Sequence, residues 1–274
     1  MSRVAAIQMA SGPHVSANLL EVSRLIAQAA ADGAKLVVLP EDFALMGSDQ
    51  DKLKICERED QGPIQAFLAG QAARHGIWLV GGTVPLFADD PMRVRAACLV
   101  YNATGQRVAR YDKIHLFDVY LEETGEKYTE SLATEAGKST VALDTPFGRL
   151  GLAVCYDLRF PELLRSLVTQ SIEIVALPAA FTAITGKAHW EILVRARAIE
   201  NLCYVVAAAQ GGYHLSGRET YGDSMIVDPW GVVLDRLARG AGVVSANLDR
   251  KRLQSIRRNF PALEHTRLRC SVVA

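Results

Sequence analysis

The sequence lacks the charge pattern of proteins that bind nucleic acid or lipid. Its 274 residues carry 30 basic and 30 acidic side chains, which leaves no formal net charge. A balanced surface gives no strong positive field to attract phosphate groups or anionic membranes. Uninterrupted apolar runs are also short, far below the length that crosses a bilayer. We therefore expect no nucleic-acid partner and no membrane association.

Cysteine and histidine are scarce as well, and their spacing argues against two further kinds of protein. The five cysteines form no C-x-x-C pair, and the six histidines form no compact pair typical of a zinc site. An odd cysteine count, with Cys98, Cys155 and Cys203 inside apolar runs, is typical of a reducing compartment. The first residues, MSRVAAIQMASG, contain too short an apolar segment for a signal peptide. We expect a cytoplasmic protein without a metal ion.

The sequence does contain one order of elements that occurs twice. Apolar runs and amphipathic segments predict a β-α-β-α-β-β order in residues 1–115 and again in residues 148–249. One predicted strand of each half ends in a similar motif, LVVLPEDF in the first and IVALPAAF in the second. Two such sheets packed face to face would give an α/β protein with a four-layer α-β-β-α sandwich. No linker rich in proline, glycine or serine divides the chain, so we expect one domain over residues 1–274.

The segment GRLGLAVCYDLRFPE, residues 148–162, contains a candidate nucleophile. Its apolar run predicts a buried strand that ends at Cys155, and Pro161 suits the first turn of a helix. Ligands of open α/β sheets bind at the carboxyl ends of strands, and backbone N–H groups there lower the pKa of a thiol. A lone cysteine at a strand end is nevertheless more often a packed core residue.

Two further residues are expected at the same edge of the sheets. Glu41 follows one predicted strand and Lys113 follows another. A carboxylate next to a thiol can accept its proton, and an ammonium group near both can stabilise a developing oxyanion. The backbone N–H of Tyr156 is the natural second oxyanion donor. Such a set would cleave the carbon–nitrogen bond of an amide or nitrile through a thioester, without a metal or an organic cofactor.

The residue pattern alone leaves alternatives to this set open. Glu41 and Lys113 could be ordinary surface residues. His115 or His189 could instead pair with the thiol, as in a Cys–His hydrolase. From a different class, the chain could be a catalytically silent scaffold that keeps the fold and binds a partner.

Residues around these positions have two interpretations as well. Asp157 and Arg159 flank the cysteine, where a structural ion-pair role is favoured over contact with a substrate carboxylate. Four residues that come after predicted strand ends could line a pocket or simply pack in the core: Phe43, Phe181, Thr182 and Thr185. Residues 118–140 predict a long loop, and long loops in compact domains are often functional.

Several motifs resemble those of the nitrilase, or carbon–nitrogen hydrolase, superfamily over nearly the whole chain. They are LVVLPEDF, YDKIHLFDV, GLAVCYDLRFPE, LPAAFTAITGKAHWEILVRARAIEN and the DPWG turn. The resemblance implies that Glu41 is a general base, Lys113 the lysine of a triad and Cys155 the nucleophile. Glu130 matches a second glutamate that the family often has after the lysine. The resemblance further implies a small-molecule amide substrate, no cofactor, and a homodimer or higher homo-oligomer.

A finer resemblance concerns the substrate. The segments HWEILVRARAIENLCYVVAAAQGG and SMIVDPWG look most like the deaminated glutathione amidase branch of the superfamily. By this resemblance the enzyme would hydrolyse deaminated glutathione to 2-oxoglutarate and cysteinylglycine. The alternative is an omega-amidase acting on 2-oxoglutaramate or on succinamate-type monoamides. The loop at residues 118–140 would border the substrate pocket.

Overall fold

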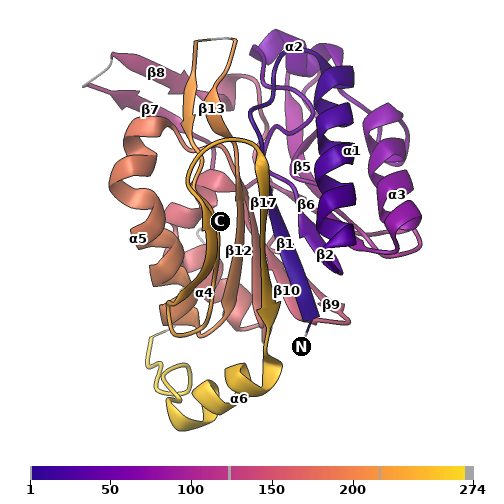
Figure 1. The fold of residues 1–274 in the computed structure, drawn as a ribbon. Coiled ribbons are helices and arrows are strands. Elements are labelled where there is room, and N and C mark those ends of the chain that lie inside the picture. The colour runs from indigo at the N-terminus through magenta and orange to yellow at the C-terminus, as the bar shows by residue number, and fades with distance from the viewer. Residues whose placement is uncertain (1, 123–124, 216, 269–274) are drawn as a thin grey trace.

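The computed structural model describes residues 2–268 except 123–124 and 216, and it confirms the four predicted layers. Two β-sheets face each other at the centre of the molecule, with α1 and α3 on one outer face and α4 and α5 on the other (Figure 1). The helices are α1 (Val15–Ala31), α2 (Asp49–Lys54), α3 (Pro63–His75), α4 (Pro161–Val168), α5 (Ala183–Asn201) and α6 (Arg250–Asn259). None of the described helices is long and apolar enough to cross a bilayer.

The first sheet has the strand order β17-β1-β2-β3-β5-β4, with β6 paired to β5. Its strands are β1 (Ser2–Gln8), β2 (Leu36–Val38), β3 (Trp78–Val80), β4 (Val84–Phe87), β5 (Val94–Tyr101), β6 (Arg107–Asp112) and β17 (Gly242–Leu248). The parallel strands β1, β2 and β3 lie side by side in it. Parallel strands have their carboxyl ends at one edge, so the segment after β2 emerges at that edge.

The second sheet has the strand order β16-β15-β12-β11-β10-β9. Its strands are β9 (Ala142–Thr145), β10 (Gly148–Leu152), β11 (Ile174–Ala179), β12 (Tyr204–Ala209), β15 (Ser224–Val227) and β16 (Val233–Leu237). Here too three parallel strands, β10, β11 and β12, are neighbours. The segments after β10 and β11 therefore emerge together, as the sequence predicts for the residues around Cys155.

The apolar runs of the central strands fill two separate cores. In β1, Val4 and Ala6 pack between the two sheets, whereas Ala5 and Ile7 pack against the helices of the first half. All four are fully buried. Because neighbouring residues of a strand face opposite sides, a strand covered on both faces requires an uninterrupted apolar run. Burying a valine or isoleucine side chain in this way stabilises the fold by roughly 1.5–3 kcal/mol.

The last strand departs from the predicted division into halves. β17 pairs antiparallel with β1, from Ser2 opposite Leu248 to Gln8 opposite Gly242, and so belongs to the first sheet. The repeat at residues 148–249 thus contributes a strand to the sheet of residues 1–115. Apolar periodicity identifies a strand but not its partner, and the sequence therefore predicts the wrong sheet for this one.

Two hairpins rise above the sheets, and one of them corrects a prediction. β7 (Asp118–Leu121) pairs with β8 (Glu126–Thr129), and β13 (Gly211–Tyr213) pairs with β14 (Glu219–Tyr221); both lie at the top of Figure 1. The predicted loop at residues 118–140 is thus wrong for β7, β8 and the 3-10 turn η1 (Glu130–Leu132), while residues 123–124 lie outside the described part. Side chains on both faces of β7 and β8 are exposed or half-buried, so the sequence lacks apolar alternation there.

One glycine positions the second hairpin against a helix. The helix α5 begins at Ala183, so Gly186 lies in its first turn. A Cβ atom on Gly186 would lie 2.2 Å from the Cβ atom of Tyr221 on β14. Only glycine allows this close approach, and the contact holds the first turn of α5 beside the hairpin.

Candidate active site

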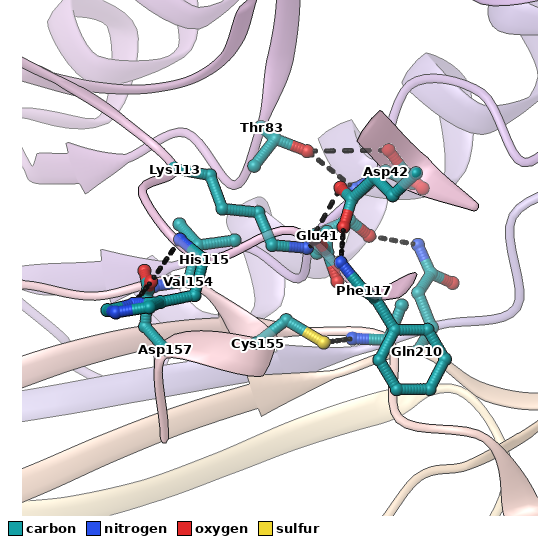
Figure 2. A network of polar contacts seen from close by, with 12 residues as sticks. Glu41, Asp42, Thr83, Lys113, His115, Phe117, Val154, Cys155, Asp157 and Gln210 are labelled. Atoms are coloured by element: carbon teal, nitrogen blue, oxygen red, sulfur yellow. Dashed lines mark hydrogen bonds and ion pairs between the residues drawn. The ribbon is translucent and has the colours of Figure 1, made fainter. Parts of the chain in front are cut away.

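Three of the predicted residues form a buried ion cluster. Lys113 Nζ lies 2.8 Å from Glu41 Oε1, and 2.9 and 2.8 Å from the two carboxylate oxygens of Glu130. Lys113 is 2% exposed and Glu41 is 5% exposed. Figure 2 shows the Lys113 side chain extending toward Glu41, with the Cys155 sulfur nearby. The strand ends thus converge as the sequence predicts, and Glu130 joins them from the 3-10 turn after β8.

The backbone of Glu41 is held from both halves of the chain. Gln210, just after β12, donates from Nε2 to the Glu41 carbonyl oxygen at 2.9 Å. The next residue, Asp42, has a left-handed φ of +54°, and its N–H donates to Thr83 Oγ1 at 2.9 Å. Lys52 Nζ donates to the Asp42 carboxylate at 3.0 Å. These contacts fix the direction in which the Glu41 carboxylate points.

Cys155 occupies a strained turn. It begins the 3-10 helix η2 (Cys155–Arg159), and its φ of +48° is unusual for any residue other than glycine. The backbone N–H of Ala180, just after β11, donates to Cys155 Sγ at 3.4 Å. The N–H of Tyr156 lies in the first turn of η2, where backbone N–H groups have no acceptor within the helix. A sulfur and a donor N–H therefore sit side by side at the end of β10.

The Asp157 carboxylate holds this turn in place. It accepts hydrogen bonds from the N–H of Val154 at 2.8 Å, the N–H of His115 at 3.0 Å and the hydroxyl of Tyr111 at 2.6 Å. Asp157 is fully buried, as expected for a structural partner. Because one carboxylate links residues on both sides of the two-sheet interface, it fixes the position of Cys155 relative to the Lys113 segment.

The charge state of the cluster is set by burial and by the neighbours. Burial raises the pKa of the Cys155 thiol well above its ordinary value, and the Glu41 carboxylate adds to this while Lys113 opposes it. Burial also raises the pKa of Glu41, against the pull of Lys113. For Lys113, burial alone would lower the pKa, but Glu130 and Glu41 outweigh it and raise the pKa well above the usual range. A neutral thiol thus lies beside a carboxylate and a charged ammonium group.

A cavity of about 200 Å³ opens onto this cluster. Eight of the predicted site residues line it: Glu41, Lys113, Glu130, Cys155, Tyr156, Phe181, Thr182 and Thr185. Phe43 does not, and its assignment to the pocket is wrong. It is fully buried in the core beneath α1 and α3, since the left-handed turn at Asp42 redirects the chain after Glu41.

Sequence reasoning missed most of the positive charge of the cavity. Its cationic lining residues besides Lys113 are Lys52, Lys127, Arg159 and Arg218. Arg159, predicted to be an internal ion-pair residue, instead places its guanidinium 5.0 Å from the Phe181 ring centroid and 5.8 Å from that of Tyr156. The only signal in the sequence for Arg218 is a basic residue in the turn SGRET, which is also typical of an exposed hairpin.

Neither candidate histidine faces the thiol. His115 Nδ1 contacts the Asp157 carboxylate at 2.7 Å, and its ring stacks on Phe160. His189 Nδ1 contacts Arg159 Nη1 at 3.1 Å. No histidine is among the described residues that line the cavity, so the geometry gives a Cys–His arrangement no support.

The described residues offer no group of three or more His, Cys, Asp and Glu side chains with the geometry to hold a metal ion. The cofactor-free chemistry expected from the sequence stays a prediction.

Two facing sheets that bring a thiol, an acid and a lysine to one edge define an enzyme of the nitrilase type. The chain belongs to the carbon–nitrogen hydrolase family, whose model matches residues 3–258. A solved structure with the same fold is that of Saccharomyces cerevisiae Nit3, described as a member of branch 10 of the nitrilase superfamily. It superposes with a TM-score of 0.85 at 30% identity, covering 95% of this chain and 94% of that one.

Two relatives of this chain have the same name. The deaminated glutathione amidase of a Synechocystis strain is 42% identical over 264 residues, which is 95% of this chain and 96% of the relative. The deaminated glutathione amidase of Yersinia enterocolitica is 39% identical over 273 residues, covering 99% of this chain and 95% of the relative. The similarity thus extends over nearly the full length of all these proteins.

Proposed function

We propose that this carbon–nitrogen hydrolase is a cysteine-dependent amidase in which Glu41, Lys113 and Cys155 are the catalytic residues. The observation that carries the proposal is the buried contact of Lys113 with Glu41 beside a thiol at a strained strand end. The thiol proton moves to Glu41 as Cys155 Sγ attacks the amide carbonyl carbon. The oxyanion that develops is stabilised by the N–H of Tyr156 and by the Lys113 ammonium group.

Collapse of this intermediate divides the substrate. Glu41 returns its proton to the amide nitrogen, the amine leaves, and the acyl group remains on Cys155 as a thioester. Glu41 then accepts a proton from a water molecule, whose oxygen attacks the thioester carbonyl. The sulfur departs, regains the proton, and the carboxylic acid product is released. Glu130 touches neither reacting atom, and we assign it the positioning of Lys113 through its two contacts with Nζ.

The substrate we propose is deaminated glutathione, cleaved to 2-oxoglutarate and cysteinylglycine. Support comes from the full-length similarity to amidases of that name and from the charge of the cavity. The substrate carries one carboxylate on the acyl side of the scissile amide and one on the leaving dipeptide. Arg159, beside the rings of Tyr156 and Phe181, suits the acyl carboxylate. The alternative substrate 2-oxoglutaramate has the same acyl group but only ammonia to release.

A direct comparison of these two amides tests the proposal. We expect kcat/KM to be at least about tenfold higher for deaminated glutathione, since its second carboxylate can gain a charge-assisted contact. Release of cysteinylglycine and of ammonia can be followed separately in matched assays. Faster turnover of 2-oxoglutaramate would instead assign the enzyme to the omega-amidases.

The pH dependence tests the role of Glu41. A general base must be deprotonated, and burial raises the Glu41 pKa above the ordinary value of 4.5. We therefore expect kcat/KM to fall on acidification with a midpoint above pH 4.5. The negative charge of Glu130 contributes to that raised pKa, so Glu130→Gln should move the midpoint to lower pH. A wild-type midpoint at or below 4.5 would rule out Glu41 as the base.

Three properties of the whole molecule are part of the proposal. One domain over residues 1–274 is supported by the pairing of β17 with β1. A homodimer or higher homo-oligomer is supported by exposed apolar residues on α5, on the turn after β15 and after α6: Ile192, Ile199, Trp230, Val232 and Phe260. A cytoplasmic location is supported by four free cysteines among the described residues.

A further inference from the structure

Two arginines line the cavity, and they lie in separate surroundings. Arg159 contacts His189 and the rings of Tyr156 and Phe181. Arg218 comes from the β13–β14 hairpin and places its guanidinium 5.4 Å from the Tyr128 ring centroid on β8. One arginine therefore belongs to the α5 side of the cavity and the other joins the two hairpins above it, which stand together in Figure 1.

The guanidinium of Arg218 has N–H donors that are not used in hydrogen bonds with the described residues. Its Nη2 donates to the Ala180 carbonyl oxygen at 2.6 Å, and Nη1 lies 4.0 Å from the sulfur of Met46. Its Nε atom is buried and has no hydrogen-bond partner among the described residues. No described carboxylate forms an ion pair with Arg218, whereas Lys52 and Lys113 both have such partners. A guanidinium with unused donors in a cavity suits a carboxylate ligand, which it can hold through two parallel hydrogen bonds.

The position of Arg218 points to one side of the scissile bond. Glu41 must give its proton to the leaving amine, so the leaving group lies on the Glu41 side of the thiol. Arg218 lies on that side, because its Nη1 is 4.0 Å from the sulfur of Met46, in the segment that follows Glu41 and Asp42. In keeping with this position, Lys52 chiefly and Arg218 in part keep the pKa of the buried Asp42 carboxyl low. The exposed Lys127 of β8 also lines the cavity, at its hairpin rim. The cavity is thus positively charged where a dipeptide would extend toward solvent.

We propose that Arg218 binds the terminal carboxylate of the leaving dipeptide and thereby selects a peptide amide over a primary amide. This inference rests on the proposed function and deepens it. Arg159 stays assigned to the carboxylate on the acyl side, which both candidate substrates share. Two arginines on opposite sides of Cys155 would then bind the two carboxylates of deaminated glutathione. Only the contact with Arg218 distinguishes cysteinylglycine from ammonia as a leaving group.

The test compares deaminated glutathione with its analogue in which the terminal carboxylate is a carboxamide. In the wild type we expect kcat/KM to favour the carboxylate form by about 10- to 100-fold, the value of one charge-assisted contact. Arg218→Gln should reduce this ratio to near one, and Arg218→Lys should retain part of it. The matched variant Arg159→Gln should lower both rates and leave the ratio close to that of the wild type.

The ratio separates substrate binding from a structural role. Arg218 contacts the carbonyl of Ala180, whose N–H touches Cys155, so a purely structural loss would lower both rates by the same factor. An unchanged ratio in Arg218→Gln, in an enzyme that turns over deaminated glutathione, would overturn only the Arg218 assignment. Wild-type turnover of 2-oxoglutaramate alone would overturn both this inference and the proposed substrate.

Discussion

Replacing Cys155 with alanine is expected to lower kcat/KM for the amide substrate by at least about 10⁴-fold, the usual effect of removing a nucleophile. Every proposed step passes through its sulfur, and no other described cysteine lines the cavity. The fold should persist, because only one small group is lost from a turn that Asp157 holds. Steady-state kinetics and a thermal unfolding curve together check both expectations.

Cys203 provides the matched control for this experiment. It is fully buried in the core, and burial raises its pKa to about 12. Cys203→Ala should keep wild-type activity while losing about 1–2 kcal/mol of unfolding free energy through the cavity it leaves. Iodoacetamide should label Cys155 before Cys203 in the folded protein. Equal labelling of the two thiols, with activity retained in Cys155→Ala, would overturn the assignment of Cys155 as the nucleophile.

Replacing Lys113 with methionine should destabilise the fold and abolish most of the activity. The change removes the cation between Glu41 and Glu130, and an uncompensated buried charge costs about 3–5 kcal/mol. In the molecules that remain folded, loss of one oxyanion donor should lower kcat by about 10²–10³-fold. Urea unfolding at several pH values, together with kcat, measures the two effects. Without Lys113 the carboxylates bind protons more tightly in the folded than in the unfolded chain, so the stability deficit should grow as pH rises.

A second substitution separates the effect of Lys113 on stability from its effect on catalysis. Glu130→Gln added to Lys113→Met removes one of the stranded charges and should restore part of the unfolding free energy. It supplies no cation, so kcat should stay low. Recovery of activity in the double variant would contradict the role assigned to Lys113, and a stability loss below about 1 kcal/mol in the single variant would contradict the buried ion cluster.

The candidate site was predictable where it depends on strand ends. Apolar runs identify β2 and β10, and parallel pairing brings the residues after each of these strands to one edge of its sheet, which is why Glu41 and Cys155 converge as expected. Lys113 comes after an antiparallel strand, and its place rests more on the motif resemblance than on topology. The assignment of Phe43 to the pocket was wrong because a single left-handed residue, Asp42, turns the Phe43 ring into the core. No apolar pattern in the sequence predicts such a turn.

Contacts between segments far apart in the chain could not be predicted from the sequence. Arg218 reaches the cavity only because the β13–β14 hairpin folds over Tyr128 of the other hairpin. Both hairpins are polar and short, so neither their strands nor their mutual packing leaves a periodic signal. The substrate-facing charge is therefore set by long-range geometry, whereas the nucleophile and base are set by local strand structure.

The pairing of β17 with β1 also affects when the protein can fold during its synthesis. Ser2 on β1 is synthesised long before its partner Leu248 on β17. The first sheet thus has an open edge until β17 is synthesised, and closing it requires contacts of very high sequence separation, which slow folding. Gln210 likewise reaches back to the backbone of Glu41. The amidase site should consequently mature only after Gln210 and β17 have been synthesised, so that a shorter nascent chain carries Glu41, Lys113 and Cys155 without the contacts that fix their geometry.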